Sequence, residues 1–143
     1  MRTIVLITLV TLAVSDVAAQ GIDRLPEKLS GRWTVVNPGG QTIIDNVSIV
    51  FDGKGEAGPV TGRYTFRGRI CGALDEPIVG AWDGVVLRFE TLHKANVNTQ
   101  RMGGECGDGR VTYVLRRKPG DRSFDGEGKF ESLGLLITIS VSP

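Results

Sequence analysis

Strict alternation between apolar and polar residues constrains the fold of this chain more than any other feature. Residues 60–68 show it most clearly, with valine, glycine, tyrosine and phenylalanine at every second position and threonine and arginine between them. Successive side chains of a β-strand point to opposite faces, so this run predicts a strand with one face in a core and one in water. The same alternation recurs along the chain, and a helical period fits none of these runs. An all-β fold is therefore expected.

The alternating runs number eight and cover residues 31–37, 45–52, 60–68, 78–83, 85–92, 110–118, 123–130 and 134–141. Turn sequences such as Asp83-Gly84 and Lys118-Pro119-Gly120-Asp121 separate several of them. Short turns place consecutive strands side by side and antiparallel. Closure into an eight-stranded up-and-down β-barrel would remove the exposed sheet edges, so we expect that architecture. A two-sheet sandwich is the alternative that the pattern also permits.

The first 19 residues have the features of a secretory signal peptide. Arg2 is followed by an apolar run over residues 3–14, and the small residues Val17 and Ala19 mark a cleavage site. The apolar run is shorter than the roughly 20 residues of a membrane-spanning helix. We therefore expect cleavage after Ala19, one domain over residues 20–143, no membrane span after cleavage, and a secreted or periplasmic protein. An uncleaved N-terminal anchor is the alternative.

Cys71 and Cys106 are the two cysteines of the chain. In an oxidising compartment an even pair with no third cysteine is expected to form one disulfide, and no CxxC spacing points to a redox site. Both cysteines lie in stretches that break the alternation, residues 70–77 and 93–109. We expect these stretches to be loops that the disulfide joins at one end of the barrel, and long loops are often functional.

Composition and motifs argue against most enzymatic and nucleic-acid functions. Seventeen basic and sixteen acidic residues leave a net charge of +1, which offers no footprint for nucleic acid or an anionic membrane. His93 is the single histidine, with no nucleophile elbow and no second metal ligand at a suitable spacing. We expect no metal, no cofactor and no catalysis. An enzyme that pairs His93 with a carboxylate is the third hypothesis, and the candidate carboxylates are Asp75 with Glu76 or Glu105 with Asp108.

The interior of an eight-stranded barrel either fills with side chains or holds one small ligand. The aromatic residues at inward positions would fill much of it: Trp33, Phe51, Tyr64, Phe66, Trp82, Phe89, Tyr113, Phe124 and Phe130. Four glycines share the inward parity: Gly62, Gly80, Gly126 and Gly128. These glycines either leave a cavity beside the rings or relieve strand coiling at barrel corners. The sequence leaves both alternatives open.

The opening Leu29-Ser30-Gly31-Arg32-Trp33 resembles the start of lipocalins, avidins and other small calycin-like barrels. The resemblance implies that Trp33 closes one end of the barrel by packing across it. It extends over about residues 29–117, because residues 60–64 resemble the third strand of avidins and residues 79–82 resemble their Gly-x-x-Trp region. The Thr-Gln-Trp motif of avidins has no counterpart, since Arg101 follows Thr99 and Gln100. The resemblance therefore implies the fold and not biotin as the ligand.

Two functional hypotheses lead. The first is a noncatalytic binding protein that takes a small or apolar ligand through the mouth of the barrel, with Tyr64, Trp82 and Tyr113 as ligand-binding residues. The second is an inhibitor of a secreted hydrolase, a protease or a lysozyme, that acts through the leader of residues 20–28 and the loop of residues 93–109. The opening motif, the export signal and the single disulfide also resemble periplasmic barrels that inhibit metalloproteases. The oligomeric state is left open.

Overall fold

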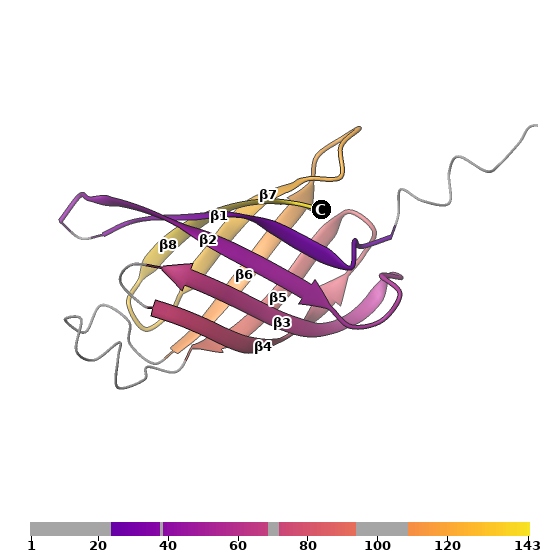
Figure 1. Ribbon diagram of the computed structural model, residues 1–143, viewed down its shortest axis with the longest axis horizontal. Coiled ribbons are helices and arrows are strands. Elements are labelled where there is room, and N and C mark those ends of the chain that lie inside the picture. Colours follow the sequence, from indigo (N-terminus) through magenta and orange to yellow (C-terminus); the bar gives the residue numbers. More distant parts are fainter. Residues whose placement is uncertain (1–23, 38, 69–71, 94–108) are drawn as a thin grey trace, which may run out of the picture.

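The computed structural model describes residues 24–37, 39–68, 72–93 and 109–143, and these form a closed antiparallel barrel of eight strands (Figure 1). The strands are β1 (Lys28–Val36), β2 (Thr42–Phe51), β3 (Gly58–Gly68), β4 (Gly72–Trp82), β5 (Val86–His93), β6 (Gly109–Arg117), β7 (Phe124–Phe130) and β8 (Leu135–Ser142). Each strand pairs with its sequence neighbours, and β1 pairs with β8. The predicted up-and-down barrel is confirmed. The signal peptide, Cys71 and Cys106 lie outside the described residues.

The predicted parity of the strands is confirmed along most of the barrel. In β2, β6 and β8 the burial alternates between buried or half-buried and exposed residues, with few exceptions. The largest fully buried side chains come from seven of the eight strands: Trp82, Tyr113, Phe124, Leu29, Ile49, Ile78, Leu87, Leu115 and Ile139. One continuous apolar core therefore lies inside the barrel wall.

Strand β4 corrects one prediction. It begins at Gly72 and not at residue 78, so most of the expected loop over residues 70–77 is strand. Residues 72–77 pair with β3 throughout, whereas pairing between β4 and β5 starts only at Ile78. Pro77 fits this arrangement because proline has no amide to donate, and no described β5 residue pairs with it.

The start of β5 corrects a second prediction. Val85, expected at the inward parity, is 58% exposed, and the strand begins at Val86. Val86 and Leu87 are both buried, so the alternation slips by one residue here. The cause is the turn, in which the Asp83 carboxylate accepts hydrogen bonds from the amides of Val85 and Val86 at 2.9 and 2.6 Å.

Three of the four inward glycines lie where neighbouring strands approach too closely for a side chain. A Cβ atom on Gly62 would lie 2.1 Å from the carbonyl oxygen of Val50, and one on Gly80 would lie 2.0 Å from that of Arg88. A Cβ atom on Gly126 would lie 2.0 Å from the carbonyl oxygen of Val114. At Gly128 the Tyr113 ring occupies the space instead, 2.5 Å from the position of a Cβ. Gly62, Gly80 and Gly126 therefore serve strand coiling, the second of the two alternatives, and Gly128 makes room for a ring.

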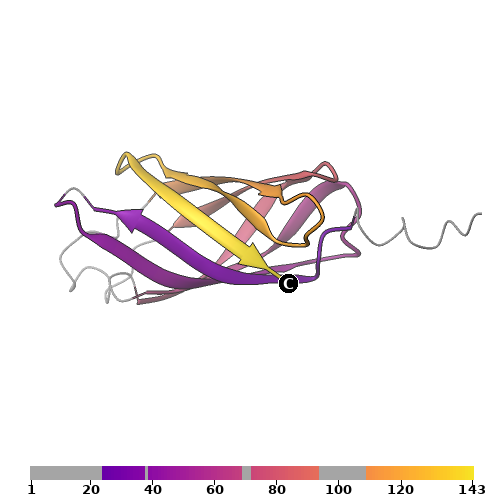
Figure 2. The ribbon, with the colours of Figure 1, turned by 90° about the horizontal axis from the view of Figure 1, so that it is seen from above.

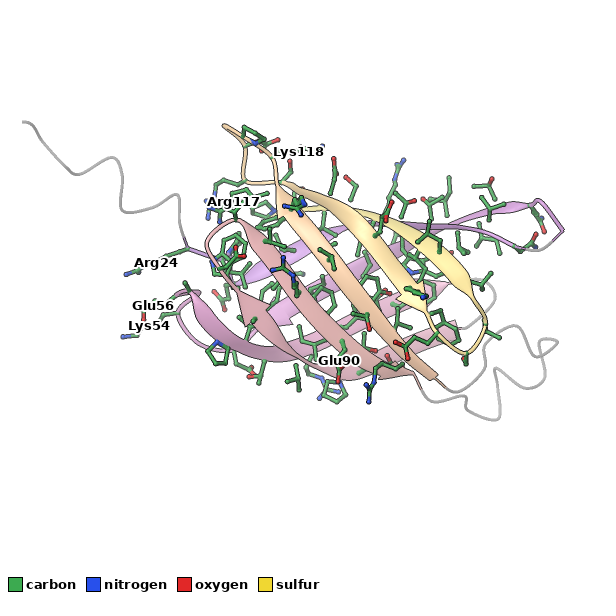
Figure 3. All side chains as sticks on the ribbon, turned by 180° about the vertical axis from the view of Figure 1, so that it is seen from behind. Arg24, Lys54, Glu56, Glu90, Arg117 and Lys118 are labelled. Atoms are coloured by element: carbon green, nitrogen blue, oxygen red, sulfur yellow. The ribbon has the colours of Figure 1, made fainter. Side chains whose placement is uncertain are left out.

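The leader closes one end of the barrel, which we call the plugged end. The Leu25 side chain is buried in the core, and its amide donates a 2.7 Å hydrogen bond to the Gly55 carbonyl. The Phe51 amide donates to the Glu27 carbonyl at 2.9 Å. Arg24 lies at this end of the molecule (Figure 3). The opposite end, where β3 and β5 finish and β4 and β6 begin, is called the loop end (Figure 2).

Candidate functional site

Tyr64 and Tyr113, two of the three predicted ligand-binding residues, face one another in the interior. Both side chains are buried, and their hydroxyl oxygens are 2.9 Å apart in a hydrogen bond. Their rings stack with centroids 5.4 Å apart, and Phe89 stacks on Tyr113 at 4.9 Å. Strands β3, β5 and β6 each contribute one of these rings. The result is an aromatic layer with two phenol groups inside the barrel.

Burial determines the protonation of this phenol pair. It raises the pKa of Tyr64 well above its ordinary value, and the neighbouring Tyr113 and Glu76 raise it further. Burial also raises the pKa of Tyr113, an effect that hydrogen bonds with Tyr64 and the Trp33 indole partly offset. Both phenols are neutral at physiological pH, so each can donate and accept a hydrogen bond.

Glu76 brings a carboxylate into the same interior. It is buried on β4 opposite Tyr64 of β3, and the Thr91 hydroxyl of β5 donates a hydrogen bond to its Oε2 atom. The preceding residue, Asp75, points outward and pairs with Arg63 at 2.7 Å. The sequence interpretation placed both acids in a loop. The parity of Ile78 and Trp82, continued backward along the strand, would have placed Glu76 inside.

Asp45 is a second inward carboxylate that the sequence interpretation missed. It is buried on β2 and lies directly across from Trp33 of β1 in the strand register. Among the described residues, none hydrogen-bonds its Oδ2 atom. Its parity, shared with Val47 and Phe51, was the signal that could have identified it. Trp33, Tyr64, Tyr113, Glu76, Thr91 and Asp45 together are called the interior cluster.

Trp82, the third predicted ligand residue, lies apart from the other two at the plugged end. Its ring packs edge to face with Phe124, with centroids 5.7 Å apart, and the Arg117 guanidinium lies 4.9 Å from its ring centroid. Arg117 also donates a 2.6 Å hydrogen bond to the carbonyl of Arg24 (Figure 3). Trp82 thus packs with the residues that hold the leader in place.

Trp33 was expected to close one end of the barrel. It is half-buried, packs edge to face against Phe66 with centroids 4.8 Å apart, and hydrogen-bonds Tyr113. Among the described residues, Leu25, Trp82 and their neighbours fill the plugged end. Trp33 lies across from Asp45 in the interior cluster, and closure of one barrel end by Trp33 stays a prediction.

The enzyme, metal-site and inhibitor hypotheses depend on residues of which the structure describes few side chains. His93 is the last residue of β5, and its side chain lies outside the description. Within the described ranges, no group of three or more His, Cys, Asp or Glu side chains could hold a metal ion, and no helix could span a membrane. Residues 24–28 of the leader are held against the barrel. An inhibitory segment would therefore have to come from residues 20–23 or 94–108, which are not described.

Open grooves mark the outer wall of the barrel. One runs over β1, β2 and β3 and is lined largely by outward residues that include Arg32, Asn46 and Arg67. A second runs over β6, β7 and β8 and is lined by residues that include Arg116 and Glu127. The carboxylates and phenols of the interior cluster line neither groove.

No family model, curated protein or solved structure matches this chain. The fold and the interior cluster define a small closed β-barrel with a polar and aromatic interior. The calycin-like resemblance stays a prediction that rests on the sequence motifs around Trp33, Tyr64 and Trp82.

Proposed function

We propose that this chain is a secreted or periplasmic, noncatalytic binding protein that takes a small ligand through the loop end of its barrel. The observation that carries the proposal is the position of the inward carboxylates and phenols. Asp45, Glu76, Tyr64 and Tyr113 all lie on the inner face, away from the leader that fills the plugged end. Export is supported by the sequence of residues 1–19 alone.

The chemistry of the interior cluster suits small-molecule recognition. Ligand sites are lined mainly by apolar and aromatic side chains with a few polar groups that fix the orientation of the ligand. Here Trp33 and Phe89 provide aromatic surface, and the Tyr64 and Tyr113 hydroxyls provide donors and acceptors. Folding alone does not favour polar groups in a barrel core, because burying them costs free energy that hydrogen bonds only partly recover.

The strand pairing supports entry from the loop end. Pairing between β2 and β3 stops at Asn46 and Arg67, and β4 pairs with β5 only from Ile78 onward. Among the described residues, fewer strand pairs are therefore formed beside Asp45 and Glu76 than at the plugged end. A ligand entering there would reach the interior cluster without displacing the leader.

Two single-tryptophan variants test the proposal. Trp82→Phe leaves Trp33 as a reporter in the interior cluster, and Trp33→Phe leaves Trp82 as a reporter at the plugged end. Each variant is titrated with octanoate, 2-phenylethanol and phenethylammonium while tryptophan emission is recorded. We expect saturable changes in Trp33 emission with at least one probe and unchanged Trp82 emission. Emission from Trp33 that stays constant with every probe, or equal changes from both reporters, would contradict the proposal.

A further inference from the structure

Asp45 is buried, and one of its two carboxylate oxygens has no hydrogen-bond partner in the part of the chain that the structure describes. It is 8% exposed, and on its own strand its inward neighbours are the apolar Ile43 and Val47. None of the described residues hydrogen-bonds Oδ2. A carboxylate oxygen removed from water without a hydrogen bond or a cation is strongly unfavourable, so folding does not account for an aspartate at this position.

The residue beside Asp45 is suited to binding a cation. Trp33 is its direct partner across the β1–β2 pair, and such partners have side chains on one face with Cβ atoms about 5 Å apart. Trp33 is only half-buried, and Phe66 packs against its indole ring. An indole face attracts a positive charge through its quadrupole. A carboxylate, an indole and apolar neighbours therefore lie together.

Asp45 lies toward the loop end of β2, where the described pairing between β2 and β3 has ended. The last β2–β3 pair is Asn46 with Arg67, so Asp45 is the first inward residue of β2 beyond the paired wall, toward the loop end. Arg67 is exposed and lies at the outward parity of β3. Among the described residues, Glu76 is the other buried carboxylate of this half of the barrel. Two inward carboxylates favour a positively charged ligand and disfavour a carboxylate.

We propose that the small ligand carries an organic ammonium group that pairs with Asp45 Oδ2 and rests against the Trp33 indole. This inference depends on the proposed binding function and names its ligand class. A hard metal ion is a poorer match, because Ca²⁺ takes six to eight oxygen ligands. Within the described ranges no group of three acidic, histidine or cysteine side chains exists.

Calorimetric titration with three probes of similar shape tests the charge requirement. The probes are phenethylammonium, 2-phenylethanol and 3-phenylpropionate. We expect phenethylammonium to bind the wild-type protein at least tenfold more tightly than either other probe. Asp45→Asn should weaken this binding at least tenfold, and the matched control Asp75→Asn, which changes an outward carboxylate, should leave it unchanged. Equal binding of phenethylammonium to wild type and Asp45→Asn would overturn the inference.

Thermal unfolding of Asp45→Asn gives an independent readout. A carboxylate kept for binding and not for folding is replaced by the isosteric amide at no cost, so the Tm should stay equal to that of wild type or rise. A fall of several degrees would make Asp45 a structural residue and overturn the inference. Wild-type protein keeps the test valid if the variant does not fold. Phenethylammonium should then shift the NMR signals of the Trp33 indole N–H and the Asp45 amide, and unshifted signals would overturn the inference.

The outcomes separate this inference from the proposed function. If 2-phenylethanol or octanoate changes Trp33 emission and Asp45→Asn leaves phenethylammonium binding unchanged, the barrel binds ligands but the ammonium site is wrong. If no probe changes Trp33 emission and none gives a calorimetric signal, both proposals fail together.

Discussion

Asp75 and Glu76 show how one step along a strand changes the role of a carboxylate. The Arg63 guanidinium hydrogen-bonds Asp75 and lowers the pKa of its carboxyl group on the outer wall, an exposed interaction that contributes little to stability. Glu76 is buried and accepts a hydrogen bond from Thr91. Residue type alone could not distinguish them, because the side on which each lies depends on strand register.

The Tyr64–Tyr113 pair predicts instability at alkaline pH. Burial raises the pKa of both phenols above the ordinary value, so the unfolded chain releases these protons at lower pH than the folded chain. Their contribution is complete below about pH 10 and is lost as the pH rises toward the raised values, by up to about 1.4 kcal/mol per pH unit for each tyrosine.

Urea unfolding of wild type and Tyr64→Phe between about pH 8 and pH 11.5 checks this. The variant should lose about 1 kcal/mol at pH 8, because one buried hydrogen bond is removed. Above about pH 10 its free energy of unfolding should fall less steeply than that of wild type. Parallel curves for the two proteins would show that Tyr64 does not titrate with folding.

The close strand contact at Gly62 predicts that adding a methyl group there lowers the free energy of unfolding. In Gly62→Ala the new Cβ would lie 2.1 Å from the Val50 carbonyl oxygen, so the backbone of β2 or β3 must shift. We expect a loss of about 1–3 kcal/mol in urea unfolding, as for an overpacked core. The control is Gly39→Ala, where the nearest of the neighbouring atoms considered is Asn37 Oδ1 at 3.4 Å. A similar loss in both variants would point to glycine flexibility and not to close strand contact.

At the scale of the element, the leader segment acts as part of the core. Leu25→Ala should lower the free energy of unfolding by about 2–4 kcal/mol, because a buried side chain is removed from the plugged end. Val79→Ala, at a position that is 62% exposed, should change it by less than about 0.5 kcal/mol. Hydrogen exchange should also accelerate at the Phe51 amide, which donates to the leader. An unchanged exchange rate would mean that the leader stays bound without the leucine.

Strands with apolar residues at each inward position could be predicted from the sequence, and the first half of β4 could not. The runs of β3, β6 and β8 stand out because valine, tyrosine, leucine and isoleucine repeat at every second residue. The first half of β4 contains Asp75, Glu76 and Pro77, all of which are uncommon in strands. Pairing with β3 overrides these local preferences. For the same reason the inward carboxylate of Glu76 was assigned to a loop.

At the scale of the molecule, the candidate site was half predictable. The parity of each strand places Tyr64 and Tyr113 inside, and the structure brings them together. Parity does not give height along the barrel axis, which depends on the stagger between strands. Trp82, the last residue of β4, was therefore grouped with two tyrosines that lie near the middle of their strands. Asp45 was overlooked because an acidic residue at the start of an alternating run, here residues 45–52, is also typical of a turn.

The Cys71–Cys106 disulfide stays a prediction. The barrel topology adds the end of the barrel at which the two cysteines are expected to lie. The strands that flank the two cysteines, β3 with β4 and β5 with β6, all meet at the loop end. Mass spectrometry of the protein produced in an oxidising compartment and kept without reductant should find no free thiol. Replacing both cysteines by serine should cost about 3–4 kcal/mol of stability, since the bridge closes a long loop in the unfolded chain. Two free thiols would contradict the prediction.

Strand β1 carries both Trp33, which borders Asp45, and the seam with β8 that completes the wall. The first and last strands must therefore pair before the interior cluster is enclosed. This pairing joins residues far apart in the sequence, and contacts of that kind form slowly. A ribosome-bound chain without its final segment would lack the closed wall around the interior cluster. The ligand binding that we propose should therefore appear late in refolding, at the same time as β1 pairs with β8 and closes the barrel.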